Sequence, residues 1–146
     1  MVRVVNDPVA VSNRLRPILL RLARELRREI HSLGVTGGQV SLLAQVKHNP
    51  GITASELAER ERVSAPGMSG HLVRLEAANL IERRRATDRR RIGLFLTSEG
   101  AKVLRSVRSK RTAWLSARLR ELEPHELDAI DAAIEPLMNL LEAEEA

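Results

Sequence analysis

Six arginines lie within nine residues of this sequence, and this density of charge is its clearest chemical signal. They are Arg83, Arg84, Arg85, Arg89, Arg90 and Arg91, with Asp88 among them. A guanidinium group is permanently charged and its planar fork matches a phosphate, so the cluster favours a polyanionic partner. Strand-like apolar residues flank it at 80–81 and 92–97. The pattern predicts a basic β-hairpin whose expected partner is a nucleic-acid backbone.

Two short helices are predicted directly before this hairpin. Thr53-Ala54-Ser55-Glu56 has the form of a capping box and should start the first helix. Residues 61–63 then turn the chain, Ser64 should cap the second helix, and Asn79 should end it in a left-handed conformation. We expect the second helix to point Met68, Leu72, Val73, Leu75 and Ala78 inward. Helix, turn, helix and hairpin in this order predict a winged helix-turn-helix.

The second of these helices would be the recognition helix, placed in the major groove of double-stranded DNA. Small residues at its start would allow a close approach, and its free N-terminal amides could bind phosphate. Ser69, His71 and Arg74 could hydrogen-bond to base edges or phosphates. The candidate DNA-binding residues here are Ser64, Pro66, Gly67, Met68, Ser69, Gly70, His71 and Arg74. Ordinary turn chemistry is the alternative explanation of the glycines and the proline.

Longer amphipathic helices are predicted on both sides of this central part. The first should start at Asp7-Pro8 and run to Leu33 with a kink at Pro17, or start only near Arg14. A capping box at 36–39 opens a helix that should end at 49–51, and two further helices should start at Thr97-Ser98-Glu99 and near Pro124. The apolar faces of the terminal helices are too extensive for one small monomer to cover, which favours a second subunit.

The predicted fold is mainly α with a small β-hairpin, a winged helix-turn-helix flanked by long N- and C-terminal dimerisation helices. We expect a single domain over residues 1–146. Its DNA-binding part would span residues 34–100, and its helical dimerisation part would comprise residues 8–33 and 101–146.

The composition limits the class of protein further. A chain of 146 residues can form one compact unit with a core, and its net charge of +5 favours polyanions, either nucleic acid or a membrane surface. There is no cysteine, and the four histidines lack the paired spacing of zinc ligands, so neither a metal nor a cofactor is expected. No complete catalytic motif is present, which argues against an enzyme. The sequence has no apolar run long enough to span a bilayer, and its N-terminus has no signal-peptide core. Both features predict a cytoplasmic protein with no membrane partner.

The middle of the sequence resembles the MarR family of bacterial winged-helix regulators. The motif that carries the resemblance is an acidic residue, an arginine two positions later, Leu-Thr and a glycine, present as Asp88, Arg90, Leu96, Thr97 and Gly100. The resemblance implies that Asp88 braces the wing and that Arg90 enters the minor groove. Asn79 stands where the family usually has glycine, and asparagine tolerates the same left-handed backbone.

The resemblance also implies a function. Members of this family form twofold dimers through their terminal helices, which would place two recognition helices on a pseudo-palindromic operator with half-sites about 10 bp apart. We therefore expect a homodimeric, sequence-specific transcriptional regulator, a repressor, that a small aromatic or phenolic effector could release. The ligand-binding residues remain unassigned, since a lone Trp114 fits a core or an interface better than a ligand site. The alternative is a nonspecific architectural DNA-binding protein, which would bind every sequence about equally.

Overall fold

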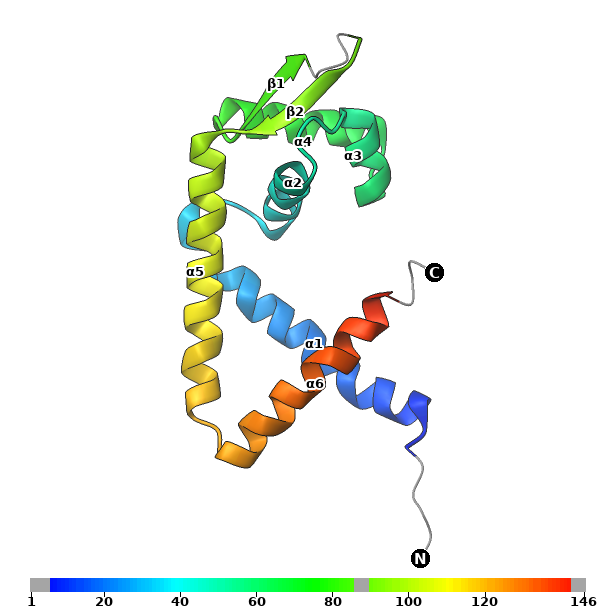
Figure 1. Cartoon of the computed structure of the whole chain (residues 1–146), viewed down its shortest axis with the longest axis vertical. Helices are drawn as coiled ribbons and strands as arrows, with labels where there is room; N and C mark the ends of the chain where they lie inside the picture. The colour runs from blue at the N-terminus through cyan, green and yellow to red at the C-terminus, as the bar shows by residue number, and fades with distance from the viewer. Residues whose placement is uncertain (1–5, 86–89, 143–146) are drawn as a thin grey trace, which may run out of the picture. The chain divides into compact units, whose positions relative to one another are not determined.

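The computed structural model describes residues 6–85 and 90–142, and over these ranges the chain forms six α-helices, one 3₁₀ turn and one β-hairpin (Figure 1). The elements are α1 (Pro8–Glu29), η1 (His31–Leu33), α2 (Gly37–His48), α3 (Ala54–Glu61), α4 (Ala65–Ala77), β1 (Ile81–Arg85), β2 (Ile92–Leu96), α5 (Ser98–Arg120) and α6 (Pro124–Glu142). The mainly α fold and the order of its elements are as predicted from the sequence. The chain divides into two compact units, residues 1–111 and 112–146.

The helix starts follow the capping residues that the sequence contains. Thr36 accepts a hydrogen bond from the Gln39 amide at 3.1 Å, and the Gln39 side chain accepts one from the Thr36 amide at 3.0 Å, which completes the predicted capping box. Ser64 caps α4 by accepting from the Gly67 amide at 3.2 Å. At Thr53 only half of the predicted box forms within the described residues: its hydroxyl accepts from the Glu56 amide, whereas the Glu56 carboxylate contacts Arg91.

The first helix begins at Pro8 and continues through Pro17, so the alternative start near Arg14 is wrong. Its N-cap is Asp7, whose side chain accepts from the Ala10 amide. The helix ends at Glu29 instead of continuing to Leu33, because η1 takes over after Ile30 and the left-handed Gly34, with φ of 74°, stops the chain. Gly34, Val35 and Thr36 connect η1 to α2.

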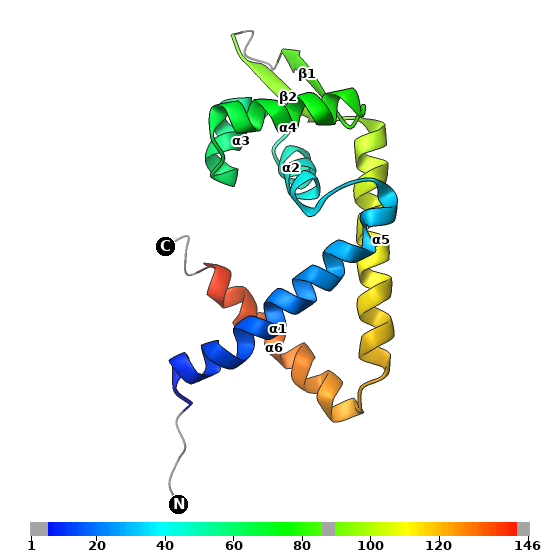
Figure 2. The same ribbon diagram turned by 180° about the vertical axis from the view of Figure 1, so that it is seen from behind.

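A small aliphatic core holds the winged helix-turn-helix together. It gathers one face each of α2, α3 and α4 with the base of the hairpin, and its most deeply buried side chains are Ile30, Leu43, Val46, Leu57, Met68, Leu72, Leu75 and Leu94. No polar side chain among the described residues is buried with them. Figure 2 shows α2, α3 and α4 gathered at the base of the hairpin. Hydrophobic burial alone therefore fixes the orientation of α4.

The hairpin is a two-stranded antiparallel sheet in which Ile81 pairs with Leu96 and Arg85 with Ile92. Ile52 adds a bridge to Leu94, so the loop before α3 is fastened to the wing. A side chain at Gly93 would lie 2.7 Å from the backbone of Gly51, and glycine at this position permits the close approach.

The end of α4 is joined closely to the start of α5. Asn79 adopts φ of 61°, the predicted left-handed end of the helix. Thr97 donates a hydrogen bond to the Asn79 carbonyl at 2.7 Å and accepts one from the Gly100 amide at 2.9 Å. A Cβ at Gly100 would lie 2.2 Å from the Leu80 carbonyl oxygen, so only glycine fits there without a backbone shift. These contacts fix where the wing leaves the recognition helix.

Val73 of α4 and Ala78, the residue after the helix, do not face the core as the sequence predicted. Val73 is 59% exposed and Ala78 is exposed. The reason is helical geometry: the buried side chains of α4 are at positions 68, 72 and 75, and residue 73 lies on the opposite side of a helix with 3.6 residues per turn. The expectation that these two residues point inward is wrong.

The second unit contains the end of α5 and α6. The Glu123 amide donates to the Glu126 carboxylate at 3.0 Å at the start of α6, and Pro136 is accommodated inside the helix. No residue of α6 is buried. Its large apolar side chains Leu127, Ile130, Ile134, Leu137, Met138, Leu140 and Leu141 are all exposed. Among the helices that the structure describes, none combines the length and apolarity needed to cross a membrane.

Candidate nucleic-acid interface

The recognition helix presents two opposite faces. Met68, Leu72 and Leu75 anchor one face in the core. The other face is exposed and carries Ala65, Pro66, Ser69, Gly70, Val73, Arg74 and Ala77. Within the described residues Arg74 has no ion-pair partner, so its guanidinium group is available to a ligand. The side chains on this face are mostly small, and α4 contacts the arginine-bearing strand β1.

The structure separates the predicted residues of this helix into three groups. Pro66, Ser69, Gly70 and Arg74 are exposed and stay candidates for direct contact with DNA. His71 is half-buried and lies towards the flank of the exposed face. Ser64 is exposed but its hydroxyl is engaged in the cap, and a Cβ at Gly67 would lie 3.0 Å from that hydroxyl, so both shape the turn.

Met68 is a correction to the predicted site. Its side chain is 1% exposed and belongs to the core, so it cannot reach a base edge. Its inclusion among the DNA-binding residues rested on its place in a run of small residues at the helix start. The separate prediction that Met68 points inward is confirmed, because its spacing from Leu72 and Leu75 puts it on the buried face. Met68 supports the position of the helix from inside.

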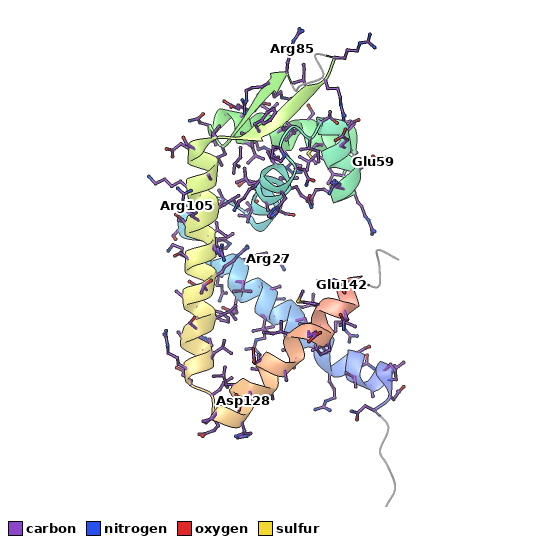
Figure 3. The ribbon with its side chains drawn as sticks, viewed as in Figure 1. Arg27, Glu59, Arg85, Arg105, Asp128 and Glu142 are labelled. Atoms are coloured by element: carbon purple, nitrogen blue, oxygen red, sulfur yellow. The ribbon has the colours of Figure 1, made fainter. Side chains whose placement is uncertain are left out.

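The wing arginines are of two kinds. Three of them are held by the protein itself: Arg83 pairs with Glu76 of α4 at 2.5 Å, Arg84 pairs with Glu82 at 2.9 Å and covers the Phe95 ring at 4.0 Å, and Arg91 pairs with Glu56 of α3. Arg85 is exposed and has no ion-pair partner within the described part of the chain. Figure 3 shows Arg85 near the end of the hairpin, pointing away from the helices.

Two of these contacts join the wing to the helix-turn-helix. Arg83–Glu76 links β1 to α4, and Arg91–Glu56 links the start of β2 to α3. Exposed ion pairs stabilise a fold by only about 0–1 kcal/mol, so their effect here is mainly to orient the hairpin against the recognition helix. Sequence reasoning missed both pairs because each joins two different elements: Glu56 is 35 residues from Arg91, and Glu76 and Arg83, although seven residues apart, lie on a helix and on the strand that follows it. The capping-box pattern had assigned Glu56 to a different partner.

Arg90 is exposed and follows the hairpin tip, while Asp88 and Arg89 lie outside the described residues. The bracing role predicted for Asp88 and the contact predicted for Arg89 therefore stay predictions. The observed geometry comprises an exposed helix face, a basic hairpin beside it and ion pairs that join the hairpin to α3 and α4. Such an arrangement suits the major groove and the adjacent backbone of a DNA duplex.

The chain is similar to known regulators in sequence. A model of the MarR family matches residues 33–91. The HTH-type transcriptional repressor MdtR of Bacillus subtilis is 33% identical over 114 residues, which cover 77% of this chain and 74% of the repressor. The chain belongs to the MarR family.

Solved structures agree with this family assignment. The YusO protein of Bacillus subtilis has a TM-score of 0.73 at 29% identity, covering 90% of this chain and 94% of that protein. A mutant of MepR from Staphylococcus aureus, solved bound to an oligodeoxyribonucleotide, has a TM-score of 0.68 at 23% identity and covers 90% of this chain and 97% of that one. This second likeness supports the fold. As a member of the MarR family, the chain is a transcriptional regulator and not an enzyme.

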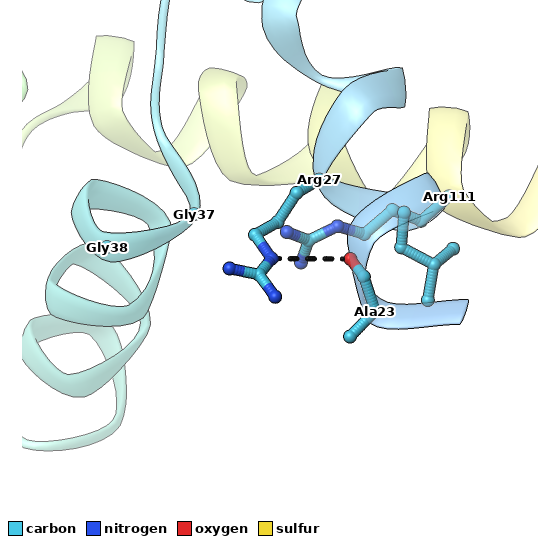
Figure 4. Close-up of a pocket in the computed structure, with 6 residues that line it drawn as sticks. Ala23, Arg27, Gly37, Gly38 and Arg111 are labelled. Atoms are coloured by element: carbon cyan, nitrogen blue, oxygen red, sulfur yellow. Dashed lines mark hydrogen bonds between the residues drawn. The ribbon is translucent and has the colours of Figure 1, made fainter. Parts of the chain in front are cut away.

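This MarR-family regulator also has a pocket of about 420 Å³ lined by Ala23, Leu26 and Arg27 of α1, Gly37 and Gly38 of α2, and Arg111 of α5. Figure 4 shows the two arginine side chains beside each other in it. Arg27 donates to the Ala23 carbonyl at 3.4 Å, and the buried Nε of Arg111 has no hydrogen-bond partner in the part of the chain that is described. Two guanidinium groups side by side favour an anion between them. The described residues contain no cluster of three or more potential metal ligands.

The division of the wing arginines leads to a prediction about salt dependence. Arg85→Gln should lower the slope of log affinity against log salt concentration by about one per bound subunit, because each subunit loses one phosphate contact. Exchanging the charges of the Glu76–Arg83 pair, as Glu76→Arg with Arg83→Glu, should leave the slope unchanged, because the link and the net charge are both kept. The affinity of each variant for a DNA duplex, measured at several salt concentrations, gives its slope. A full unit lost in the exchanged variant would mean that Arg83 contacts phosphate directly.

Proposed function

We propose that this regulator is a homodimeric repressor that binds a pseudo-palindromic operator. In each half-site α4 lies in the major groove, and the hairpin follows the backbone so that Arg90 reaches the minor groove. The observation that carries the proposal is the exposed face of α4, which lies opposite its core face and beside the basic strand β1. The similarity to the repressor MdtR, and to MepR bound to DNA, supports it.

A binding-site selection on randomised duplexes tests this function. We expect one sequence with twofold symmetry, half-sites about 10 bp apart, and an affinity at least about 10³-fold above that for random DNA. Arg90→Ala should weaken binding to that sequence by about 1–3 kcal/mol. The control is Arg28→Ala on α1, which lowers the net charge equally and should have little effect. An affinity ratio near one would instead identify a nonspecific architectural protein.

The dimer rests on the apolar surfaces that the terminal helices leave uncovered. In α6 every large apolar side chain is exposed, and in α1 Val9, Val11, Ile18, Leu19, Leu20 and Leu22 are exposed. An exposed apolar face of this extent on each helix marks an interaction site. Because a C₂ interface uses the same patch on both subunits, the apolar faces of these helices in one subunit can pack against the same faces in the second subunit.

A charge placed on α6 should disrupt this dimer. Ile134 is 52% exposed, and Ile134→Glu would put an unpaired carboxylate into the interface twice, once from each subunit. We expect a monomer by sedimentation velocity at micromolar concentration. The matched control, Asn139→Glu on the same helix, adds the same charge at an exposed polar position and should remain a dimer. A dimer that persisted in Ile134→Glu would place the interface elsewhere.

The arginine-lined pocket is the proposed effector site. Its volume of about 420 Å³ lies within the range of small-molecule sites, and Arg27 and Arg111 favour a small aromatic anion. The stem of Arg27 lies across Gly37, where an added Cβ would be 3.0 Å away, so glycine leaves room for the arginine. Trp114 does not line this pocket; it is half-buried on α5, with Arg118 over its ring at 4.9 Å.

Benzoate and its uncharged analogue benzamide can test the effector site. Benzoate at about one hundred times its dissociation constant should raise the free energy of unfolding by about 2.7 kcal/mol and release the selected operator, whereas benzamide should do neither. Arg111→Gln should abolish the response, and Arg108→Gln, an exposed arginine on the same helix, should keep it. Equal responses to both compounds would argue against the guanidinium groups as the recognition element.

A further inference from the structure

Val73 occupies the middle of the exposed face of the recognition helix. At 3.6 residues per turn, Pro66, Gly70, Val73 and Ala77 fall on one line along α4, at positions i, i+4, i+7 and i+11. This line lies opposite Met68, Leu72 and Leu75, which anchor the helix in the core. The side of α4 that faces away from the core therefore carries a β-branched apolar residue, Val73.

The neighbours of Val73 make its side chain more prominent. A Cβ added at Gly70 would meet no atom within 4 Å, and Ala77 contributes a single methyl group. Ser69 and Arg74 stand on either side of this line and supply the polar groups of the face. Val73 is 59% exposed, so intramolecular packing does not account for its apolar side chain. A surface that covered this face would bury the valine near its centre.

We propose that Val73 packs against the C5-methyl group of a thymine in the major groove and thereby selects thymine at one position of each half-site. The methyl group of thymine is the one apolar feature among the base edges of that groove. A purine at this position would place hydrogen-bonding atoms against the valine and remove their water without replacing it, and cytosine would lack the methyl group, so each of them costs free energy relative to thymine. The inference rests on the proposed placement of α4 in the major groove and adds a specificity-determining residue to it.

Deoxyuridine provides a direct test, because it pairs as thymine does but lacks the C5-methyl group. Each thymine of the selected operator is replaced in turn, symmetrically in both half-sites, and the affinity of the full-length protein is measured. We expect one symmetric pair of replacements to weaken binding about fourfold per half-site, the ratio that about 0.8 kcal/mol per buried methyl group gives. Val73→Ala should bind the thymine operator more weakly and should not distinguish the two duplexes.

Val73→Ile is the matched control, since it keeps a β-branched apolar side chain at the same exposed position of α4 and should keep the full sensitivity to deoxyuridine. If no replacement weakens binding, or if Val73→Ala responds as the unmodified protein does, the proposal is overturned while the regulator function stands. If the selection recovers no specific operator, the proposed function itself fails. The deoxyuridine series on the unmodified protein tests the thymine contact even if Val73→Ala folds poorly.

Discussion

The whole interface depends on one constraint: α4 must bury one face completely while leaving the other bare. Met68, Leu72 and Leu75 meet this constraint by packing into an aliphatic core to which α2, α3 and the hairpin base also contribute. No buried polar side chain among the described residues competes with this packing, so hydrophobic burial alone sets the rotation of the helix about its axis. A rotation by one residue would bury Ser69 in place of Met68 and Val73 in place of Leu72, and would turn Met68 and Leu72 out of the core.

The position of the wing follows from the end of the same helix. Asn79 leaves α4 in a left-handed conformation, Thr97 joins its carbonyl to the start of α5, and Gly100 lets the Leu80 carbonyl approach. The Arg83–Glu76 and Arg91–Glu56 pairs then hold the hairpin against α4 and α3. Positive charge in the wing thus has two uses. Some guanidinium groups orient the hairpin, and Arg85 at its end carries a charge without an ion-pair partner in the described chain.

Local signals in the sequence predicted most of the fold. Thr36, Ser64 and Asn79 act within three or four residues of themselves, so their effect on helix starts and ends could be predicted without knowledge of the fold. Contacts between separate elements could not be predicted in this way. Glu56 had two possible partners, the Thr53 amide and Arg91, and only the folded chain brings Arg91 near it. Val73 was predicted to point inward because its apolar type was weighted above helical phase. The inward prediction for Met68 was right, and its inclusion among the DNA-binding residues was wrong, because the spacing of Met68 from Leu72 and Leu75 already placed it on the buried face.

Charged contacts and base contacts contribute differently to binding, and this difference explains why the proposed operator must contact two copies of α4. Arginine contacts to phosphate supply affinity that falls with salt and carries no sequence information. The exposed face of α4 has few hydrogen-bonding side chains, chiefly Ser69 and Arg74, with Gly70, Val73 and Ala77 between them. A specificity ratio of about 10³ corresponds to about 4 kcal/mol, whereas one good base contact contributes about 1–3 kcal/mol. Two half-sites divide that requirement into about 2 kcal/mol each, which one polar contact and one buried methyl group can supply. A monomer with this helix would bind DNA but would select its site weakly, because α4 offers few groups for base contacts. The proposed dimer, formed through the uncovered apolar faces of the terminal helices, would supply the second α4 that specific binding requires.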